Sequence, residues 1–285
     1  MLYISKFASL VKFSHTIFAM PFALVSYVYA LVSTGTAFSW ALLLKILLCM
    51  ITARNAAMAF NRLIDSDIDA KNPRTANREI PSGKVSKRSA MIFIFVNTLL
   101  FVIFAATINR LCGLLSPLAL IVLLGYSYTK FFTRWSHLVL GVALGIAPIG
   151  SYLAVTGSIA VFPILLSGLV ISWVFGFDII YALQDRDFDR ENNLNSIPAT
   201  TSVKKALIIS LFAHVVTIYA IFITGVRYNF GWLYWFGAAI FAIILIIQHL
   251  LVTPNRLSRT DFVFGWLNPV GSTVYAICSC LAMLC

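Results

Sequence analysis

The sequence predicts an all-α membrane protein, a bundle of about nine transmembrane helices. Its 285 residues are 60% hydrophobic and only 11% charged, and the mean hydropathy is +0.92. A soluble domain carries about 25% charged residues, so water cannot be the main solvent of this chain. The long apolar runs also lack the polar half that an amphipathic surface helix needs.

A helix needs about 20 mostly apolar residues to cross the hydrocarbon core. No cleavable signal peptide is expected, because the first apolar stretch runs past any small-residue cleavage site. Windows of this kind cover Ile17–Val32, Trp40–Phe60, Ala90–Ile108, Cys112–Tyr126, Leu138–Val155, Val161–Leu183, Ala206–Thr224, Trp232–Leu250 and Phe262–Leu284.

The charge distribution predicts the orientation of these spans. The linkers after the second, fourth, sixth and eighth spans hold nearly all of the Lys and Arg residues behind the net charge of +11. The linkers Ser33–Ser39 and Thr156–Pro163 carry no charge, and the other two on that side carry only Arg110 and Arg227. We therefore expect a multi-pass protein of a bacterial inner membrane, with the basic linkers cytoplasmic. Topology and anionic lipid account for the basic excess, so no nucleic-acid partner is needed.

The cysteines and histidines of the sequence do not form a recognisable metal-binding pattern. Neither residue type shows ligand spacing, and the cysteines fit small buried hydrophobes. Only His15, at the cytoplasmic start of the first span, is placed to reach a ligand. The residues concerned are Cys49, Cys112, Cys278, Cys280, Cys285, His15, His137, His214 and His249.

Nine of the ten acidic residues fall in two clusters. In the first cluster, Asn61, Asp65 and Asp69 are spaced i, i+4, i+8, which places them on one helical face about 6 Å apart. Like charges at this spacing destabilise a helix, so the arrangement indicates a bound cation. Hard oxygen ligands favour Mg²⁺ or Ca²⁺. Asp67 points to another side of the helix.

The second cluster repeats this spacing with Tyr181, Asp185 and Asp189 at the end of the sixth span. Asp178 lies two turns before Asp185 on the same face and within the apolar span. An acid at that depth is expensive unless it is paired or lines a polar cavity, so Asp178 is a candidate functional residue. Asp261 fits a simple interfacial position.

Two acidic clusters on one side of a bundle suggest a shared anionic ligand, because Mg²⁺ usually keeps positions that substrate phosphates fill. Arg54 lies two turns before Asn61 on the same face, inside the membrane, and Lys130 ends the fourth span on the cytoplasmic side. Positive-inside sorting explains the remaining basic residues of the first linker, Arg74, Arg78, Lys84, Lys87 and Arg88.

These motifs together resemble the UbiA superfamily of intramembrane prenyltransferases. The resemblance covers almost the whole chain, with departures at Arg62, Ser127 and Phe131, where members often have Asp, Pro and Arg. The motifs that carry it are Arg54-x6-Asn61-x3-Asp65-x3-Asp69, Asn72-Pro-Arg74-Thr75 with Arg78, Tyr126-x3-Lys130, Gly141–Gly150 with Pro148, Asp178-x2-Tyr181-x3-Asp185-x3-Asp189, and Asn268.

The resemblance implies one domain over residues 1–285, with a central cavity that opens sideways to lipid beneath the two acidic linkers. It implies Asp178 and Tyr181 beside the reacting allylic carbon, and phosphate contacts from Lys130, Arg54 and Tyr126. It also implies Mg²⁺ ligands on the diphosphate of an isoprenoid, namely Asn61, Asp65, Asp69, Asp185 and Asp189.

Within the superfamily, the first motif most resembles the branch that prenylates aromatic acids in quinone biosynthesis. This branch includes 4-hydroxybenzoate polyprenyltransferases and the menaquinone prenyltransferase of the futalosine pathway, which acts on a dihydroxynaphthoate; we favour the latter. Haem or a chlorin is an alternative acceptor. Candidates to bind the acceptor's carboxylate are Arg54, His15 and Arg134.

Two other classes of protein are alternatives to a prenyltransferase. Intramembrane Asp and Arg also mark the ion pathways of secondary transporters, but here the acids cluster at the cytoplasmic ends of spans and nothing indicates inverted repeats. A structural scaffold leaves the nine clustered acids without a role.

Overall fold

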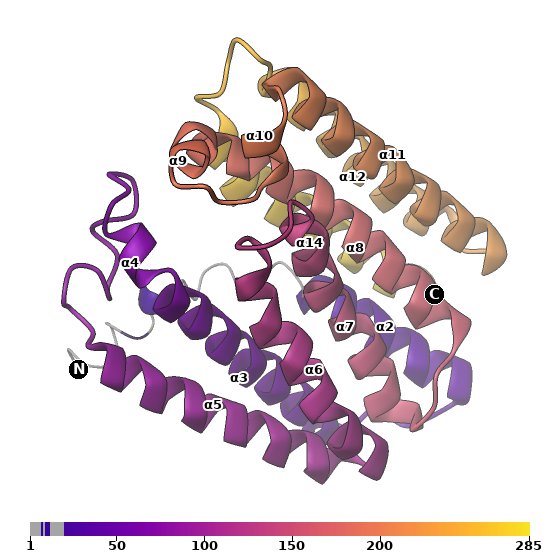
Figure 1. Cartoon of the computed structure of the whole chain (residues 1–285). Coiled ribbons are helices and arrows are strands. Elements are labelled where there is room, and N and C mark those ends of the chain that lie inside the picture. The colour runs from indigo at the N-terminus through magenta and orange to yellow at the C-terminus, as the bar shows by residue number, and fades with distance from the viewer. Residues whose placement is uncertain (1–6, 8, 12–19) are drawn as a thin grey trace. The chain divides into compact units, whose positions relative to one another are not determined.

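The computed structural model describes residues 7, 9–11 and 20–285, and within these residues the chain is helical and contains no strand (Figure 1). The all-α class predicted from the sequence is confirmed. Eight of the helices are long and apolar enough to cross a membrane, and a shorter apolar helix of 15 residues precedes them.

The long helices coincide with the windows found in the sequence. The bounds of the unbroken helices are α2 (Met20–Thr34), α3 (Trp40–Ile64), α5 (Lys87–Ile108), α6 (Arg110–Thr129), α7 (Ser136–Thr156), α8 (Val161–Ala182), α11 (Val203–Arg227) and α12 (Trp232–Leu251). The last span is divided into α13 (Thr260–Phe262), a π-helical turn η3 (Val263–Leu267) and α14 (Asn268–Leu284).

Local sequence explains where several helices begin and end. Ser39, Ser86 and Ser202 each precede a helix, and each hydroxyl accepts a hydrogen bond from the backbone N–H three residues later. Such N-caps satisfy a backbone donor that the helix leaves without a partner. At the other end of α7, Gly157 adopts a left-handed conformation with φ of +65°, which stops the helix without a Cβ penalty.

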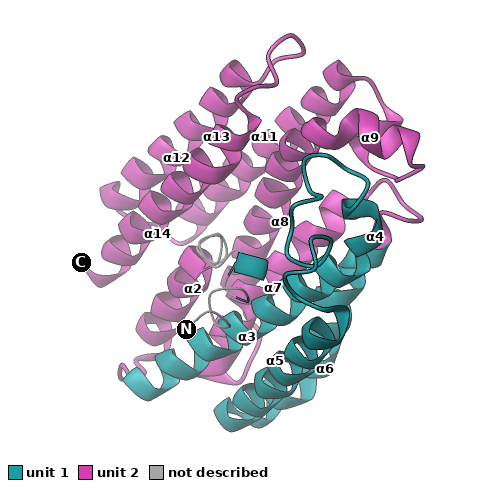
Figure 2. Cartoon of the chain, turned by 90° about the vertical axis from the view of Figure 1, so that its left-hand side faces the viewer, with its two compact units in different colours: residues 1–16, 39–128 teal, residues 17–38, 129–285 magenta. Residues whose placement is uncertain are grey.

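The first compact unit comprises residues 39–128 and the described residues near the N-terminus (Figure 2). Here α3 packs along α5, and Asn55 Nδ2 donates to Asn97 Oδ1 across the pair at 3.1 Å. Near the start of α3 and the end of α5, Lys45 Nζ donates to the carbonyl of Thr107 at 2.8 Å. Such interhelical bonds matter in an apolar environment, where hydrophobic burial alone does not hold helices together.

The second unit comprises residues 17–38 and 129–285 (Figure 2). Helix α8 forms its centre and packs against α7 and α11, while α2 packs against α7 and α14. A Cβ on Gly141 would lie only 2.7 Å from the carbonyl oxygen of Ile171, so glycine permits the close approach of α7 to α8. Trp173, Phe22 and Phe241 fill the core of this unit.

The spans that carry the acidic motifs are interrupted at the motifs themselves. Helix α3 ends at Ile64 and is followed by the short α4 (Ser66–Asp69). Helix α8 ends at Ala182 and is followed by the 3₁₀ turn η2 (Leu183–Asp185) and by α9 (Arg186–Glu191). The short α10 (Ile197–Thr200) then leads to α11.

Candidate active site

The first acidic motif keeps helical spacing across the break between α3 and α4. The backbone N–H of Asp65 donates to the carbonyl of Asn61 at 2.9 Å, and that of Asp69 donates to the carbonyl of Asp65 at 2.7 Å. Both are i to i+4 bonds, so Asn61, Asp65 and Asp69 remain one turn apart on one face, as the sequence predicts. Asp65 and Asp69 are both buried.

Basic side chains surround the carboxylate of Asp69. Arg78 Nη1 donates to Oδ1 at 2.7 Å and to Oδ2 at 2.8 Å, and Arg62 Nη1 lies 4.0 Å from Oδ2. The linker folds back over this group, because Thr75 Oγ1 donates to the carbonyl of Asp69 at 3.1 Å. Positive-inside sorting alone does not account for Arg78, because this member of the first motif binds one of the motif's acids.

Asp67 faces away from this group. Its side chain is 85% exposed, and Lys87 Nζ donates to Oδ1 at 2.8 Å. The hydrogen bond from Lys87 lowers the pKa of Asp67. Asp67 thus pairs with the start of α5 and leaves the inward face to Asp65 and Asp69, as the helical spacing predicts.

Helices α3 and α6 bring a cation and a phenol to the first motif. The guanidinium of Arg54 is largely buried, and its Nε has no hydrogen-bond partner among the described residues. Arg54 lies within electrostatic reach of the hydroxyl of Tyr126, which also lies within reach of Asp65. The first unit therefore gathers Arg54, Tyr126 and Asp65, which are three of the residues singled out in the sequence.

The second acidic motif is gathered around Asp189. Ser196 Oγ donates to Asp189 Oδ2 at 3.0 Å, and Asp185 and Lys130 lie within electrostatic reach of Asp189. The backbone N–H of Asn195 donates to the carbonyl of Lys130 at 2.8 Å, which ties the segment after α9 to Lys130 within the second unit. Asp187 instead faces outward, 85% exposed, and pairs with Arg186.

Asp178 is bonded to a residue that sequence reasoning set aside. His137, in the first turn of α7, has its Nδ1 2.7 Å from Asp178 Oδ2. The two residues are 41 positions apart, and no spacing in the linear sequence links them. The sequence shows His137 only as one of several scattered histidines, and the packing of α7 on α8 brings it to the motif.

Tyr181 faces a residue of the last span. The ring of Phe264 stacks on that of Tyr181 with centroids 4.1 Å apart and an angle of 28° between the planes. Phe264 also meets Phe177 edge to face at 5.7 Å. Aromatic residues are so frequent in this chain that nothing in the sequence distinguished Phe264 from its neighbours.

A buried polar network holds the π-helical turn that carries Phe264. Asn268 Nδ2 donates to the carbonyl of Val263, the first residue of the turn, at 3.2 Å. Asn268 Oδ1 accepts from Trp173 Nε1 at 3.0 Å and from Gln248 Nε2 at 2.9 Å. π-Helical turns occur frequently at functional sites, and the sequence pattern of a uniform span gave no sign of this one.

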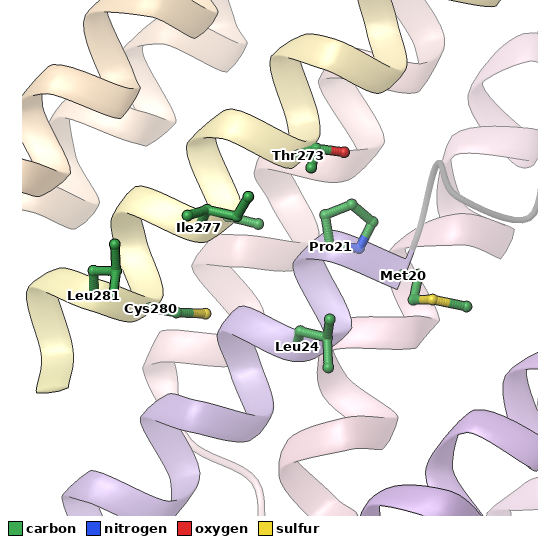
Figure 3. A pocket seen from close by; sticks show the side chains of 8 residues that line it. Met20, Pro21, Leu24, Thr273, Ile277, Cys280 and Leu281 are labelled. Carbon is green, nitrogen blue, oxygen red and sulfur yellow. The ribbon is translucent and has the colours of Figure 1, made fainter.

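An apolar groove of about 350 Å³ lies between α2 and α14 (Figure 3). Figure 3 shows Pro21 and Leu24 of α2 on one side, and Ile277 of α14 on the other. Its lining is almost wholly apolar, so the groove suits a hydrocarbon chain better than a polar group.

No group of three or more His, Cys, Asp or Glu residues is arranged as a metal site within the described part of the chain. The donor set still fits a hard divalent cation, since Asp185 and Asp189 lie within reach of each other and like charges at short range are relieved by a cation. Asp65 and Asp69 offer a second pair one helical turn apart.

Two candidates for binding an acceptor carboxylate are not supported by a contact. Arg134 is exposed, with its guanidinium 5.6 Å from the ring centroid of Trp135. His15 lies outside the described residues.

The family model of the UbiA prenyltransferase family matches residues 19–269. The chain belongs to this family. The resemblance recognised in the motifs is confirmed, and this prenyltransferase is a multi-pass membrane protein.

Known relatives agree with the assignment. A 4-hydroxybenzoate octaprenyltransferase of Paraburkholderia phytofirmans is 30% identical over 83% of this chain and 82% of its own. The apo structure of a UbiA homolog from Aeropyrum pernix K1 is 32% identical, covers 95% of this chain and 97% of its own, and has a TM-score of 0.83. A UbiA homolog from Archaeoglobus fulgidus, bound to DMAPP and Mg²⁺, shares the fold with a TM-score of 0.70 at 17% identity, over 95% of this chain and 99% of its own.

Proposed function

We propose that this UbiA prenyltransferase transfers a polyprenyl group from a polyprenyl diphosphate to an aromatic acid, with Mg²⁺ as its cofactor. The observation that carries the proposal is the pairing of carboxylates with cations in both acidic motifs. Asp65 and Asp69 lie one turn apart directly after α3, the helix that carries Arg54, and Asp189 lies near Asp185 and Lys130. The Archaeoglobus fulgidus homolog, which binds DMAPP and Mg²⁺, supports the same ligand class here.

The proposed roles follow the position of each residue. Arg54, Tyr126 and Lys130 contact the phosphate oxygens, and Asp178 and Tyr181 lie beside the allylic carbon. When bound, Mg²⁺ supplies positive charge to the diphosphate. The residues proposed to hold it are Asn61, Asp65, Asp69, Asp185 and Asp189.

The reaction needs charge stabilisation at two places. As the allylic C–O bond breaks, its electron pair leaves with the diphosphate, and fixed cations such as Lys130 and Arg54 stabilise that charge most in the transition state. The carbon left behind is cationic, and the carboxylate of Asp178 stabilises it until an aromatic ring carbon forms the new C–C bond. That ring carbon then loses its C–H proton to the released diphosphate or to solvent, which restores the aromatic ring. Apolar walls keep water from capturing the cation first.

The acceptor we propose is 4-hydroxybenzoate or a dihydroxynaphthoate. The relative from Paraburkholderia phytofirmans carries the name of a 4-hydroxybenzoate enzyme, which supports the first of these acceptors over the one favoured by the motif alone. The site would face the cytoplasm of a bacterial cell, because the linkers that carry both motifs are the basic ones.

A radiolabel assay tests this function. Purified full-length chain in detergent is incubated with a polyprenyl diphosphate, Mg²⁺ and either aromatic acid, and the expected result is a prenylated acid. Haem and a chlorin serve as alternative acceptors in parallel reactions. Release of diphosphate without a prenylated acid would reject the acceptor class, and a transporter or scaffold would release none.

A further inference from the structure

The hydrogen bond between His137 and Asp178 is asymmetric. Asp178 Oδ2 lies 2.7 Å from His137 Nδ1, whereas Oδ1 receives no hydrogen bond from a described residue. The side chain of Asp178 is 19% exposed and that of His137 only 6%. One carboxylate oxygen is therefore fixed against α7, and the other is left for a substrate.

The imidazole makes no second hydrogen bond in the described part of the chain, although it lies within electrostatic reach of Asp189. Its Nε2 is buried and lacks a hydrogen-bond partner there. A histidine that served to tie two helices together would be expected to use both nitrogens, because an unsatisfied buried polar atom is costly. The bond to Asp178 is thus the one hydrogen bond that this buried side chain makes within the described residues.

Asp178 needs such support because of its depth. It lies in α8 about one turn before the helix ends at Ala182, inside a span that is apolar on both sides of it. An acidic group at this depth is costly unless it is paired or hydrogen-bonded. A donor on a rigid helix start also restricts the rotation of the carboxylate, which keeps its free oxygen in one direction.

We propose that His137 is a positioning residue, which binds Asp178 Oδ2 so that Oδ1 faces the allylic cation. The inference rests on the proposed function, in which Asp178 lies beside the allylic carbon. His137 itself touches neither substrate. Its effect belongs to the ionisation step, because the positive charge that Asp178 stabilises develops only as the C–O bond breaks.

Three substitutions at one position test the inference. His137→Leu removes the hydrogen bond, His137→Asn places an amide N–H near the position of Nδ1, and His137→Gln places one near Nε2. Each variant is assayed for the slow diphosphate release that occurs without an aromatic acid, when water captures the cation to give the prenyl alcohol and a proton, and for prenyl transfer with the acid present. Diphosphate release reports ionisation for any prenyl acceptor, so it separates the role of His137 from the identity of the aromatic acid.

We expect His137→Leu to lower kcat for diphosphate release roughly 10- to 100-fold, the scale of a misplaced catalytic group. KM for the prenyl diphosphate should stay within about twofold, since the phosphate contacts are intact. His137→Asn should recover most of the rate and His137→Gln should not. Equal loss in Asn and Leu variants, or a loss confined to KM, would overturn the inference.

His249→Leu is the matched control. His249 Nε2 lies 2.9 Å from His214 Nδ1, so this variant also removes a buried histidine hydrogen bond in the second unit, but one that does not involve Asp178. It should lower the melting temperature and leave kcat unchanged. A loss of kcat as large as that of His137→Leu would mean that both losses come from general destabilisation, and would contradict the proposal.

A double-mutant cycle tests whether His137 acts through Asp178. If His137 acts through Asp178, then His137→Leu should cause no further loss of diphosphate release in an Asp178→Asn background. Additive losses would contradict the proposal. If the unmutated chain releases diphosphate but prenylates no aromatic acid, the acceptor assignment fails while the cycle still decides the role of His137. No release at all would reject both.

Discussion

Arg78 binds both carboxylate oxygens of Asp69 through a single nitrogen, with Nη1 2.7 Å from Oδ1 and 2.8 Å from Oδ2. Two residues earlier, Asp67 is bound by Lys87 at the exposed face. The same short helix therefore presents one acid inward and one acid outward, each with its own basic partner. The two partners differ in burial, because the side chain of Arg78 is 20% exposed and that of Lys87 is 55% exposed.

This difference predicts different consequences for the two aspartates. Asp69→Ala should lower kcat/KM at least roughly 100-fold, the scale lost with one preorganised charge-stabilising group, because it removes a proposed metal ligand. Asp67→Ala removes only an exposed ion pair, which contributes about 0–1 kcal/mol, so its activity should stay close to that of the unmutated chain.

Both variants are compared in one preparation, with melting in detergent as the check on folding. Asp187→Ala is the matched control in the second motif, since Asp187 is 85% exposed like Asp67. Equal and severe losses in Asp67→Ala and Asp69→Ala, at unchanged melting temperature, would contradict the assignment of an inward face.

Removal of divalent metal should abolish both diphosphate release and prenyl transfer. The proposed ligands are carboxylates, and carboxylates without a cation repel a diphosphate instead of binding it. Incubation with EDTA followed by dialysis tests this, and Mg²⁺ or Mn²⁺ should restore activity. Full activity in the presence of chelator would exclude the proposed site.

The sequence predicted the helices and the inward faces well for identifiable reasons. Apolar windows of span length and an i, i+4, i+8 repeat of Asn61, Asp65 and Asp69 depend only on neighbours in the chain. The bonds from Asp65 to Asn61 and from Asp69 to Asp65 preserve this repeat even though α3 itself ends at Ile64.

What the sequence missed depends on contacts between distant segments. His137 meets Asp178 across 41 residues, and Arg78 folds back on Asp69 through a linker without regular periodicity. The π-helical turn before Asn268 adds one residue to a turn and leaves the apolar pattern of the span unchanged. Patterns of charge and hydropathy along the sequence do not reveal any of these features.

The orientation of the linkers is testable with single cysteines in a background without the native ones. Asp67, Asp187 and Arg256 are exposed positions in the basic linkers, and Ser158 is exposed in a linker on the opposite side. In sealed inverted vesicles, an impermeant maleimide should label cysteines at the first three positions and not at Ser158. Labelling of positions 67 and 187 from opposite sides would rule out a diphosphate shared by the two motifs.

The contact between Phe264 and Tyr181 leads to the last prediction. Phe264→Leu keeps most of the apolar volume but removes a ring stacked at 4.1 Å, an interaction of about 0.5–1.5 kcal/mol. If Tyr181 lies beside the allylic carbon, kcat should fall roughly 2- to 10-fold, the same free energy expressed as a rate. Phe230→Leu is the control, because Phe230 packs on Tyr234 at 4.9 Å and touches neither acidic motif.

Asn268→Leu should weaken the same contact between Phe264 and Tyr181, because Asn268 helps to hold the helical turn that carries Phe264. It removes the acceptor of Trp173 Nε1 and Gln248 Nε2, and each buried donor left without a partner costs about 1–3 kcal/mol. It also removes the side-chain bond to the carbonyl of Val263, which keeps only the bond from the backbone N–H of residue 268, so the π-helical turn that carries Phe264 is held less firmly. Its melting temperature should therefore fall well below that of Phe264→Leu. Adding Phe264→Leu to Asn268→Leu should lower kcat little further, because the ring has already lost its position. Fully additive losses in kcat would mean that Asn268 stabilises the fold without directing Phe264 onto Tyr181.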